Sequence, residues 1–209
     1  MGLDKIVSDM DGILKAKDEK REKVIAYSRE IIRRSGSAVL AIHKKDDEGV
    51  RENLDAARAA LESSLEICKE QPEYYFTGPL PQAFQEYAEA AVVLALVKKR
   101  RIPAPQDLKV PVESYITGLA DAAGEMRRYA LDSLRRDDFE EAERALGVMD
   151  EVYTALKSLD YPRAVVPNLR RKVDIIRKLV EETRGDVTLA HQGRLIRGSI
   201  GRALKKGRK

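Results

Sequence analysis

The sequence contains few of the residues on which disulfide-rich, histidine-based or aromatic-rich sites depend. It has no tryptophan, one cysteine and two histidines, and aromatic residues make up only 5% of the chain. A single cysteine forms no intrachain disulfide, which fits a reducing compartment. Because Cys68 follows Ile67 in an amphipathic stretch, we expect a buried structural thiol and not a reactive one.

Long apolar segments are also missing. The first residues, MGLDKIVSDMDG, lack a signal-peptide pattern. The longest uncharged apolar run has about eight residues, far fewer than the ~20 that are needed to cross a bilayer. We therefore expect a soluble, cytoplasmic protein with no membrane partner.

Alternation of apolar and polar residues is rare, so the sequence gives little support to strands. Charged residues make up 35% of the chain, and Ala, Glu, Lys, Arg and Leu form much of it, which is a helix-forming composition. Helical spacing of apolar residues predicts helices at about 3–44, 47–70, 81–100, 112–136, 139–159 and 165–184, with a short basic helix at 189–205.

This pattern predicts an all-α protein, a single-domain helical bundle of six to seven helices with a long first helix, over residues 1–186. A helix of about 40 residues is ~60 Å long. Because a compact domain of this size does not need such a length, we expect part of the first helix to pack on another subunit.

The net charge of +4 comes from the C-terminal end. Residues 191–209 contain seven Lys and Arg and no acid, while the other 190 residues carry 32 cations and 35 acids. We therefore treat residues 187–209 as a basic tail that includes the short helix. Such a tail favours nucleic acid or another polyanion, and it is equally typical of a disordered, solubilising end.

Two glutamates occupy an otherwise apolar helix in the stretch FQEYAEAAVVLALVKKRR. Glu86 and Glu89 lie on one side of this helix with Val93 and Val97, and the opposite side is apolar too. A helix that is apolar on all sides is normally buried. Two carboxylates on such a helix need a positive partner.

A second acidic pair occurs in YITGLADAAGEMRR, where Asp121 and Glu125 share one helix face among small residues. Gly118 and Gly124 weaken this helix by roughly 1 kcal/mol each relative to alanine. Close approach of another helix is the usual reason for such a face. We expect this acidic pair to point into a tight helix–helix junction.

If the two pairs converge, four buried carboxylates stay ionised only beside a positive charge. Mg²⁺ or Mn²⁺ suits such an all-oxygen set, and iron is disfavoured because neither histidine belongs to a Glu-x-x-His motif. Both spacings also occur on solvated helix faces. The acids would then form salt bridges with Arg127 or Lys98 in a helical interaction scaffold.

Three blocks, in order, resemble the translin family and, within it, trax-like members (translin-associated factor X). They are YSREIIRRSGSAVLAIHK, FQEYAEAAVVLALVK and ESYITGLADAAGEMRRYALDSLRRDDFEEA, within residues 20–185. The resemblance implies an all-helical fold, a hollow octamer and binding of single-stranded RNA or DNA. It also implies a Mg²⁺-dependent endoribonuclease site of four carboxylates, which fall here on Glu86, Glu89, Asp121 and Glu125. The long insert of trax is absent, since only KRRIPAPQDLKVP joins the acidic blocks. This difference suggests a single-subunit, prokaryotic-type relative that forms a homo-oligomer.

The expected reaction is hydrolysis of single-stranded RNA by water, leaving a 3′-hydroxyl and a 5′-phosphate. Attack by the 2′-hydroxyl usually needs a His or Lys base, and the chain has few histidines. The expected RNA contacts are Arg29, Arg33, Arg34, His43, Lys44 and Arg128. The alternative is a non-catalytic, translin-like protein that binds single-stranded RNA or DNA.

Overall fold

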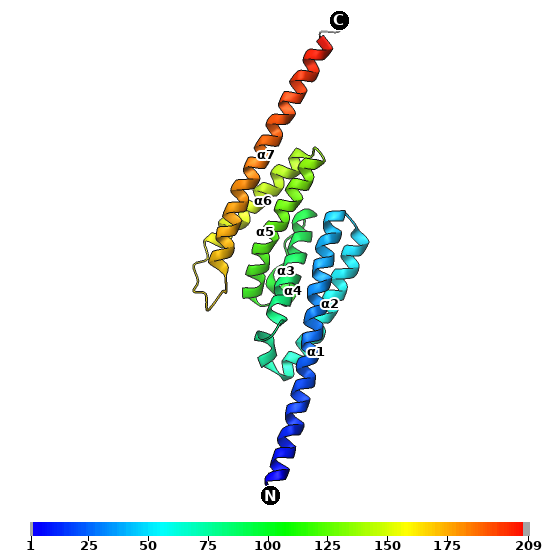
Figure 1. Cartoon of the computed structure of the whole chain (residues 1–209), viewed down its shortest axis with the longest axis vertical. Coiled ribbons are helices and arrows are strands. Elements are labelled where there is room, and N and C mark those ends of the chain that lie inside the picture. Colours follow the sequence, from blue (N-terminus) through cyan, green and yellow to red (C-terminus); the bar gives the residue numbers. More distant parts are fainter. Residues whose placement is uncertain (1, 207–209) are drawn as a thin grey trace. The chain divides into compact units, whose positions relative to one another are not determined.

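The computed structural model describes residues 2–206, and every regular element in that range is helical (Figure 1). The all-α prediction is confirmed. The elements are α1 (Leu3–Lys44), α2 (Asp47–Glu70), the 3₁₀ helix η1 (Pro72–Phe76), α3 (Leu80–Val97), α4 (Pro105–Leu108), α5 (Val112–Arg135), α6 (Phe139–Lys157) and α7 (Leu169–Lys206). Within the described range, no helix is both long enough and apolar enough to cross a membrane. The tail residues Arg208 and Lys209 lie outside the described residues.

The predicted helix bounds agree closely for the first five predicted helices and fail at the C-terminal end. The expected helices at 165–184 and 189–205 form one continuous helix, α7. Gly185 lies in the gap between these two expected helices, and a helical glycine costs only about 1 kcal/mol relative to alanine. Thr183 and Val187 on either side of it are buried, so their packing carries the helix through the glycine.

The chain forms two compact units, Met1–Gly118 and Leu119–Lys209, and the boundary between them falls inside α5. The division into a helical domain at 1–186 and a basic tail at 187–209 stays a prediction, although α7 runs through residue 186 without a break.

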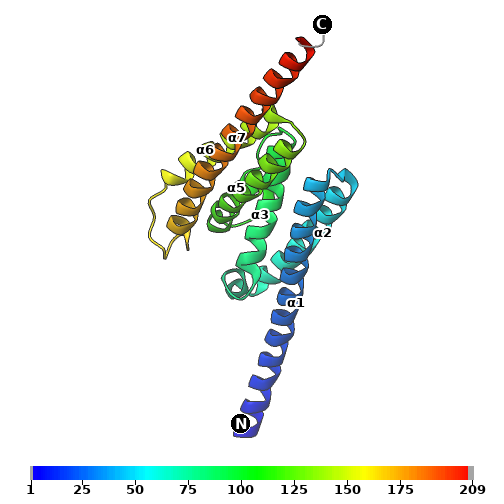
Figure 2. The ribbon, with the colours of Figure 1, turned by 45° about the horizontal axis from the view of Figure 1, so that its top comes forward.

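In the first unit, α1 and α2 form a helical hairpin whose turn is two residues long. Lys45 ends α1 in the left-handed conformation, with φ of 59°, and its N–H donates to the Ile42 carbonyl. Asp46 then caps α2, accepting a hydrogen bond of 3.0 Å from the Gly49 N–H. The two helices lie side by side, and α1 also packs against α3 (Figure 2).

The core of this unit depends on small residues at helical spacing. The buried face of α1 includes Ser28, Ile31, Ser35 and Ala38, which recur every three or four residues. Ser28 satisfies its own hydroxyl by donating to the Val24 carbonyl at 2.7 Å. Small side chains let neighbouring helices approach closely. The predicted burial of the helix at 81–100 is confirmed, because α3 has buried residues around its whole circumference.

The N-terminal part of α1 is exposed at every described residue from 2 to 19. Near the end of this segment Lys17 contacts η1, where it pairs with Glu73 at 3.2 Å and its carbonyl accepts a hydrogen bond from Tyr74. Figure 2 shows this segment extending beyond α2. It carries an apolar stripe with large exposed fractions: Leu3 74%, Met10 56% and Ile13 60%. The expectation that part of the first helix packs on another subunit stays a prediction. The apolar stripe is the surface at which we expect this contact.

The second unit is built on α6 and α7 together with the C-terminal part of α5. Asp138 caps α6, accepting a hydrogen bond of 3.2 Å from the Glu141 N–H. Met149 on α6 and Ile176 and Val180 on α7 are buried. They belong to the apolar core of this unit, in which α6 packs against α7.

Candidate functional site

The first acidic pair lies on α3, in the first unit. Glu86 and Glu89 are half-buried, while Tyr87 and Ala88 between them are fully buried. Most residues of α3 are buried, so the helix has few positions that suit polar side chains. The Tyr87 hydroxyl accepts a hydrogen bond of 3.4 Å from Arg58, and this bond raises the pKa of the Arg58 guanidinium. Tyr87 is therefore part of the packing of α3.

The start of α5 approaches α3 very closely at this pair. A Cβ on Gly118 would lie 2.5 Å from the Gln85 carbonyl oxygen and 3.0 Å from the Glu89 amide nitrogen. Ser114, one turn earlier, donates to the Pro81 carbonyl at 3.1 Å. The predicted tight helix–helix junction is confirmed at Gly118. It is not found at Gly124, where a Cβ would meet no described atom within 4 Å.

The second acidic pair lies on α5, in the second unit. Asp121 and Glu125 follow Gly118 by three and seven residues, so the three positions share one face of α5. Both acids are half-buried. The Lys172 ammonium on α7 donates a hydrogen bond to the Asp121 carboxylate. Arg128 lies 3.9 Å from Glu125, a loose ion pair on the same helix.

The cations named in the scaffold alternative have other partners. Arg127 contacts Asp186 at 3.1 Å and donates to the Thr183 hydroxyl at 2.6 Å, both on α7. Lys98 pairs with Asp47 at 2.6 Å. The lysine that does reach an acid of the candidate site, Lys172, was missed by the sequence analysis. It lies 51 residues from Asp121, and no local spacing connects the two positions.

The donor chemistry of the four acids suits Mg²⁺ or Mn²⁺, which prefer carboxylate oxygens. Each pair alone supplies two carboxylates. Across residues 2–206, no group of three or more His, Cys, Asp and Glu side chains is arranged to hold a metal ion. The metal site that the family resemblance implies therefore stays a prediction.

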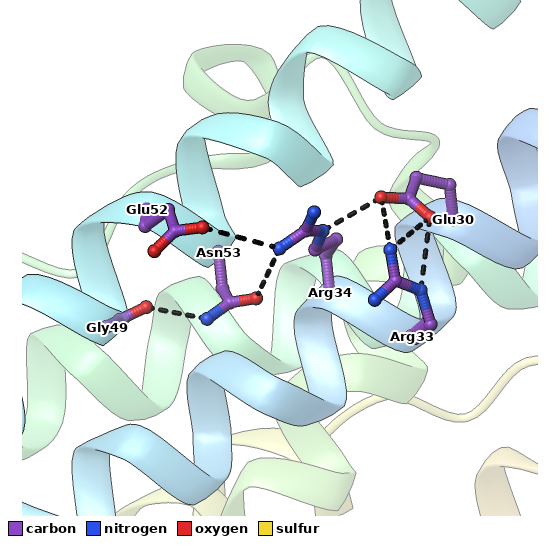
Figure 3. A network of polar contacts seen from close by, with 6 residues as sticks. All are labelled: Glu30, Arg33, Arg34, Gly49, Glu52 and Asn53. Carbon is purple, nitrogen blue, oxygen red and sulfur yellow. Dashed lines mark hydrogen bonds and ion pairs between the residues drawn. The ribbon is translucent and has the colours of Figure 1, made fainter.

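Of the expected RNA contacts, Arg33 and Arg34 belong to a polar network on α1 and α2 (Figure 3). Glu30 accepts hydrogen bonds from Arg33 at 2.6 Å and from Arg34 at 2.8 Å. Arg34 also donates to Asn53 at 3.2 Å. The bond from Arg33 and then that from Arg34 lower the pKa of the Glu30 carboxyl. These two arginines are thus held in place by the protein before any ligand binds.

The remaining residues that were expected to contact RNA differ in how exposed they are. Arg29 and Lys44 are exposed on α1, and His43 beside Lys44 is half-buried. Arg128 is exposed on α5, in the second unit. The structure therefore brings Arg33, Arg34 and Glu30 together, and it leaves Arg29 and Lys44 as solvated cations on the same helix.

The burial of Cys68 is confirmed, since 6% of this residue is exposed. Burial also raises the pKa of its thiol, which disfavours the reactive thiolate.

Comparison with known proteins gives a consistent result. The model of the Translin family matches residues 19–183 of this chain. An uncharacterized protein of Methanocaldococcus jannaschii is 35% identical over 188 residues, which cover 89% of this chain and 83% of that protein.

Solved structures agree with the sequence matches. A structure of AfC3PO in complex with duplex RNA has a TM-score of 0.82 and 30% identity, covering 90% of this chain and 98% of that one. AfC3PO alone is matched with a TM-score of 0.82, 31% identity and the same coverage. Apo-NeC3PO has a TM-score of 0.81 at 21% identity, covering 88% and 96% of the two chains, and shows similarity of fold alone.

Proposed function

The chain belongs to the translin family, and on that premise we propose that it is a Mg²⁺-dependent endoribonuclease that hydrolyses single-stranded RNA. The observation that carries the proposal is the acid set. Each of the four positions that correspond to the trax carboxylates is acidic here and half-buried: Glu86, Glu89, Asp121 and Glu125. Partial burial of a charged carboxylate costs folding free energy. Acids that are kept on closely packed helices in spite of this cost are candidates for a functional site.

Binding of RNA is supported from two directions. The chain is 30% identical to AfC3PO, whose structure with duplex RNA shares its fold. Its own α1 carries Arg29, Arg33, Arg34 and Lys44, and the Glu30 network fixes two of these cations in position. Preorganised guanidinium groups lose little entropy on binding phosphate.

In the proposed mechanism, Glu86, Glu89, Asp121 and Glu125 would hold the metal, Mg²⁺ or Mn²⁺. Such an ion would supply positive charge at the scissile phosphate and lower the pKa of a water molecule. One of the carboxylates would accept the proton of the attacking water. Arg128, beside Glu125, orients a neighbouring phosphate. The products are a 3′-hydroxyl and a 5′-phosphate.

The proposed assembly is a hollow homo-oligomer, an octamer as the family resemblance implies. Its support on this chain is the exposed apolar stripe on the N-terminal part of α1, formed by Leu3, Ile6, Met10, Ile13 and Leu14. Monomeric proteins rarely leave a long apolar helix face in water. The segment 3–19 carries five acids and three cations, whereas the C-terminal part of α7 is basic. A second copy is therefore a complementary partner.

The second candidate is a protein that binds single-stranded RNA or DNA without cutting it. The Lys172–Asp121 contact favours this candidate, because the lysine already supplies one of the positive charges that the acids need.

One cleavage assay separates the two candidates. End-labelled single-stranded RNA is incubated with the protein in Mg²⁺, in EDTA and with the Glu89→Gln variant. Glu113→Gln, which removes an exposed carboxylate from α5, serves as the matched control. Cutting that requires Mg²⁺ and Glu89 but not Glu113 supports the nuclease. RNA that is bound and left intact in all samples identifies the binding protein. Products ending in a 2′,3′-cyclic phosphate would contradict attack by water.

A further inference from the structure

A pocket in the second unit has no assigned role. It lies at the loop between α6 and α7 and has a volume of about 730 Å³, within the range of about 300–1,000 Å³ that is common for small-ligand sites. Its lining residues run from the end of the loop into the first turn of α7: Asp160, Tyr161, Pro162, Arg163, Val166, Asn168, Leu169, Arg170 and Arg171.

The floor and the walls of this pocket are firmly built. Val166 and Leu169 are 4% and 2% exposed, so the floor is apolar and anchored in the core of the unit. The amides of Val165 and Val166 donate to the Pro162 carbonyl, at 2.9 and 3.2 Å. Pro162 itself has a fixed φ, which stiffens the loop further. The pocket is therefore preformed.

The rim of the pocket is positively charged. Three arginines, Arg163, Arg170 and Arg171, face one acid, Asp160, which leaves an excess of two positive charges. Arg170 is paired with Asp160 at 2.8 Å. In the part of the chain that the structure describes, Arg163 and Arg171 have no acidic partner. Both guanidinium groups are exposed at the mouth of a preformed hollow, which is a suitable arrangement for phosphate.

An aromatic ring lies beside these cations. Tyr161 lines the pocket and is 49% exposed, and an accessible tyrosine ring is a surface of the kind on which nucleobases stack. Stacking on such a ring requires an unpaired base, because bases inside a duplex are already stacked on their neighbours. Cations next to an open aromatic ring are the combination by which proteins hold single strands.

We propose that this pocket binds one unpaired nucleotide of a single-stranded RNA, with its base on Tyr161 and its phosphates on Arg163 and Arg171. The inference rests on the proposed function and adds a second point of contact to it. Lys172, the residue after Arg171, holds Asp121. The same turn of α7 therefore carries a cation of the pocket and the partner of a carboxylate assigned to the metal.

The test of the cations measures binding of a short fluorescent single-stranded RNA to the full-length protein in EDTA, at several salt concentrations. Arg163→Gln with Arg171→Gln is expected to weaken binding about tenfold or more, and to lower the salt dependence of log K by about 1.4, which is 0.7 for each lost phosphate contact. The matched control, Arg177→Gln with Lys178→Gln, removes two charges from exposed positions elsewhere on α7 and should keep the wild-type salt dependence.

The test of the aromatic ring compares Tyr161→Phe with Tyr161→Leu. The phenylalanine variant should bind single-stranded RNA as the wild type does, and the leucine variant about tenfold more weakly. Affinity for duplex RNA should be the same in both. The proposal would be overturned if Tyr161→Phe and Tyr161→Leu bound single-stranded RNA equally well. It would also be overturned if the double arginine variant and its matched control had the same salt dependence. If the wild type binds and cuts RNA and the pocket variants do so equally well, only the proposal for the pocket is contradicted. A wild type without RNA affinity would remove the proposed function as well.

Discussion

The ammonium group of Lys172 on α7 donates a hydrogen bond to the Asp121 carboxylate on α5, and both side chains are sheltered, with exposed fractions of 19% and 30%. A carboxylate assigned to a metal site thus already has a cationic partner from the protein. An ammonium and a divalent ion compete for the same oxygen. The lysine therefore weakens the binding of a metal ion to this carboxylate.

Replacement of Lys172 by methionine should therefore strengthen metal binding. We expect Mg²⁺ or Mn²⁺ to bind roughly tenfold more tightly, since removal of a nearby positive charge is worth on the order of 1.4 kcal/mol at intermediate dielectric. Titration calorimetry measures the affinity, and the Mg²⁺-dependent rise in melting temperature should be larger in the variant. Lys178→Met on the exposed side of α7 is the control. Identical metal affinity in wild type and Lys172→Met would show that Asp121 is not a ligand.

The close contact at Gly118 predicts opposite effects for two similar substitutions. Gly118→Ala places a Cβ against the Gln85 backbone carbonyl, which should lower the free energy of unfolding by about 1–3 kcal/mol. Gly124→Ala puts a methyl group into open space on the same helix and should raise it by about 0.5–1 kcal/mol. Urea unfolding of the two variants measures both values. A stabilising Gly118→Ala would mean that the two helices are farther apart than the structure has them.

The Glu30 network predicts part of the dependence of stability on pH. The pKa of Glu30 is lowered in the folded protein, first by Arg33 and then by Arg34. Its contribution is therefore present above the carboxyl pKa of the unfolded chain and is lost as the pH falls through the folded value. Glu30→Gln should lower the urea midpoint slightly at pH 7 and make no difference at low pH. Glu151→Gln, an exposed acid on α6, should leave the midpoint unchanged at both. An equal loss at both pH values would point to packing instead of charge.

The apolar stripe on the N-terminal part of α1 predicts a specific effect on assembly. Ile13→Lys puts a charge in the middle of the stripe, and Ser8→Lys puts the same charge on the opposite side of the helix. Burying an unpaired lysine in an interface costs several kcal/mol. Light scattering after size-exclusion chromatography should therefore show smaller particles for Ile13→Lys alone. Equal masses for the two variants would place the subunit interface elsewhere.

Periodicity was sufficient to predict most of the helices. The bounds of α1 and α2 followed from apolar spacing, because this signal acts within a few residues along the chain. The continuity of α7 through residues 185–188 could not be predicted in this way. Gly185 is a helix breaker only where tertiary packing does not hold its neighbours, and here Thr183 and Val187 are buried on either side of it.

The sequence by itself determined the helical class and the identity and spacing of the acids, because residue type and helical period are local properties. Only the tertiary structure decided what surrounds them. Gly118 rather than Gly124 makes the close helix contact, and Lys172 rather than Arg127 reaches an acid of the candidate site. Contacts of this kind join residues that are far apart in the chain. They depend on how whole helices pack, which no short stretch of sequence specifies.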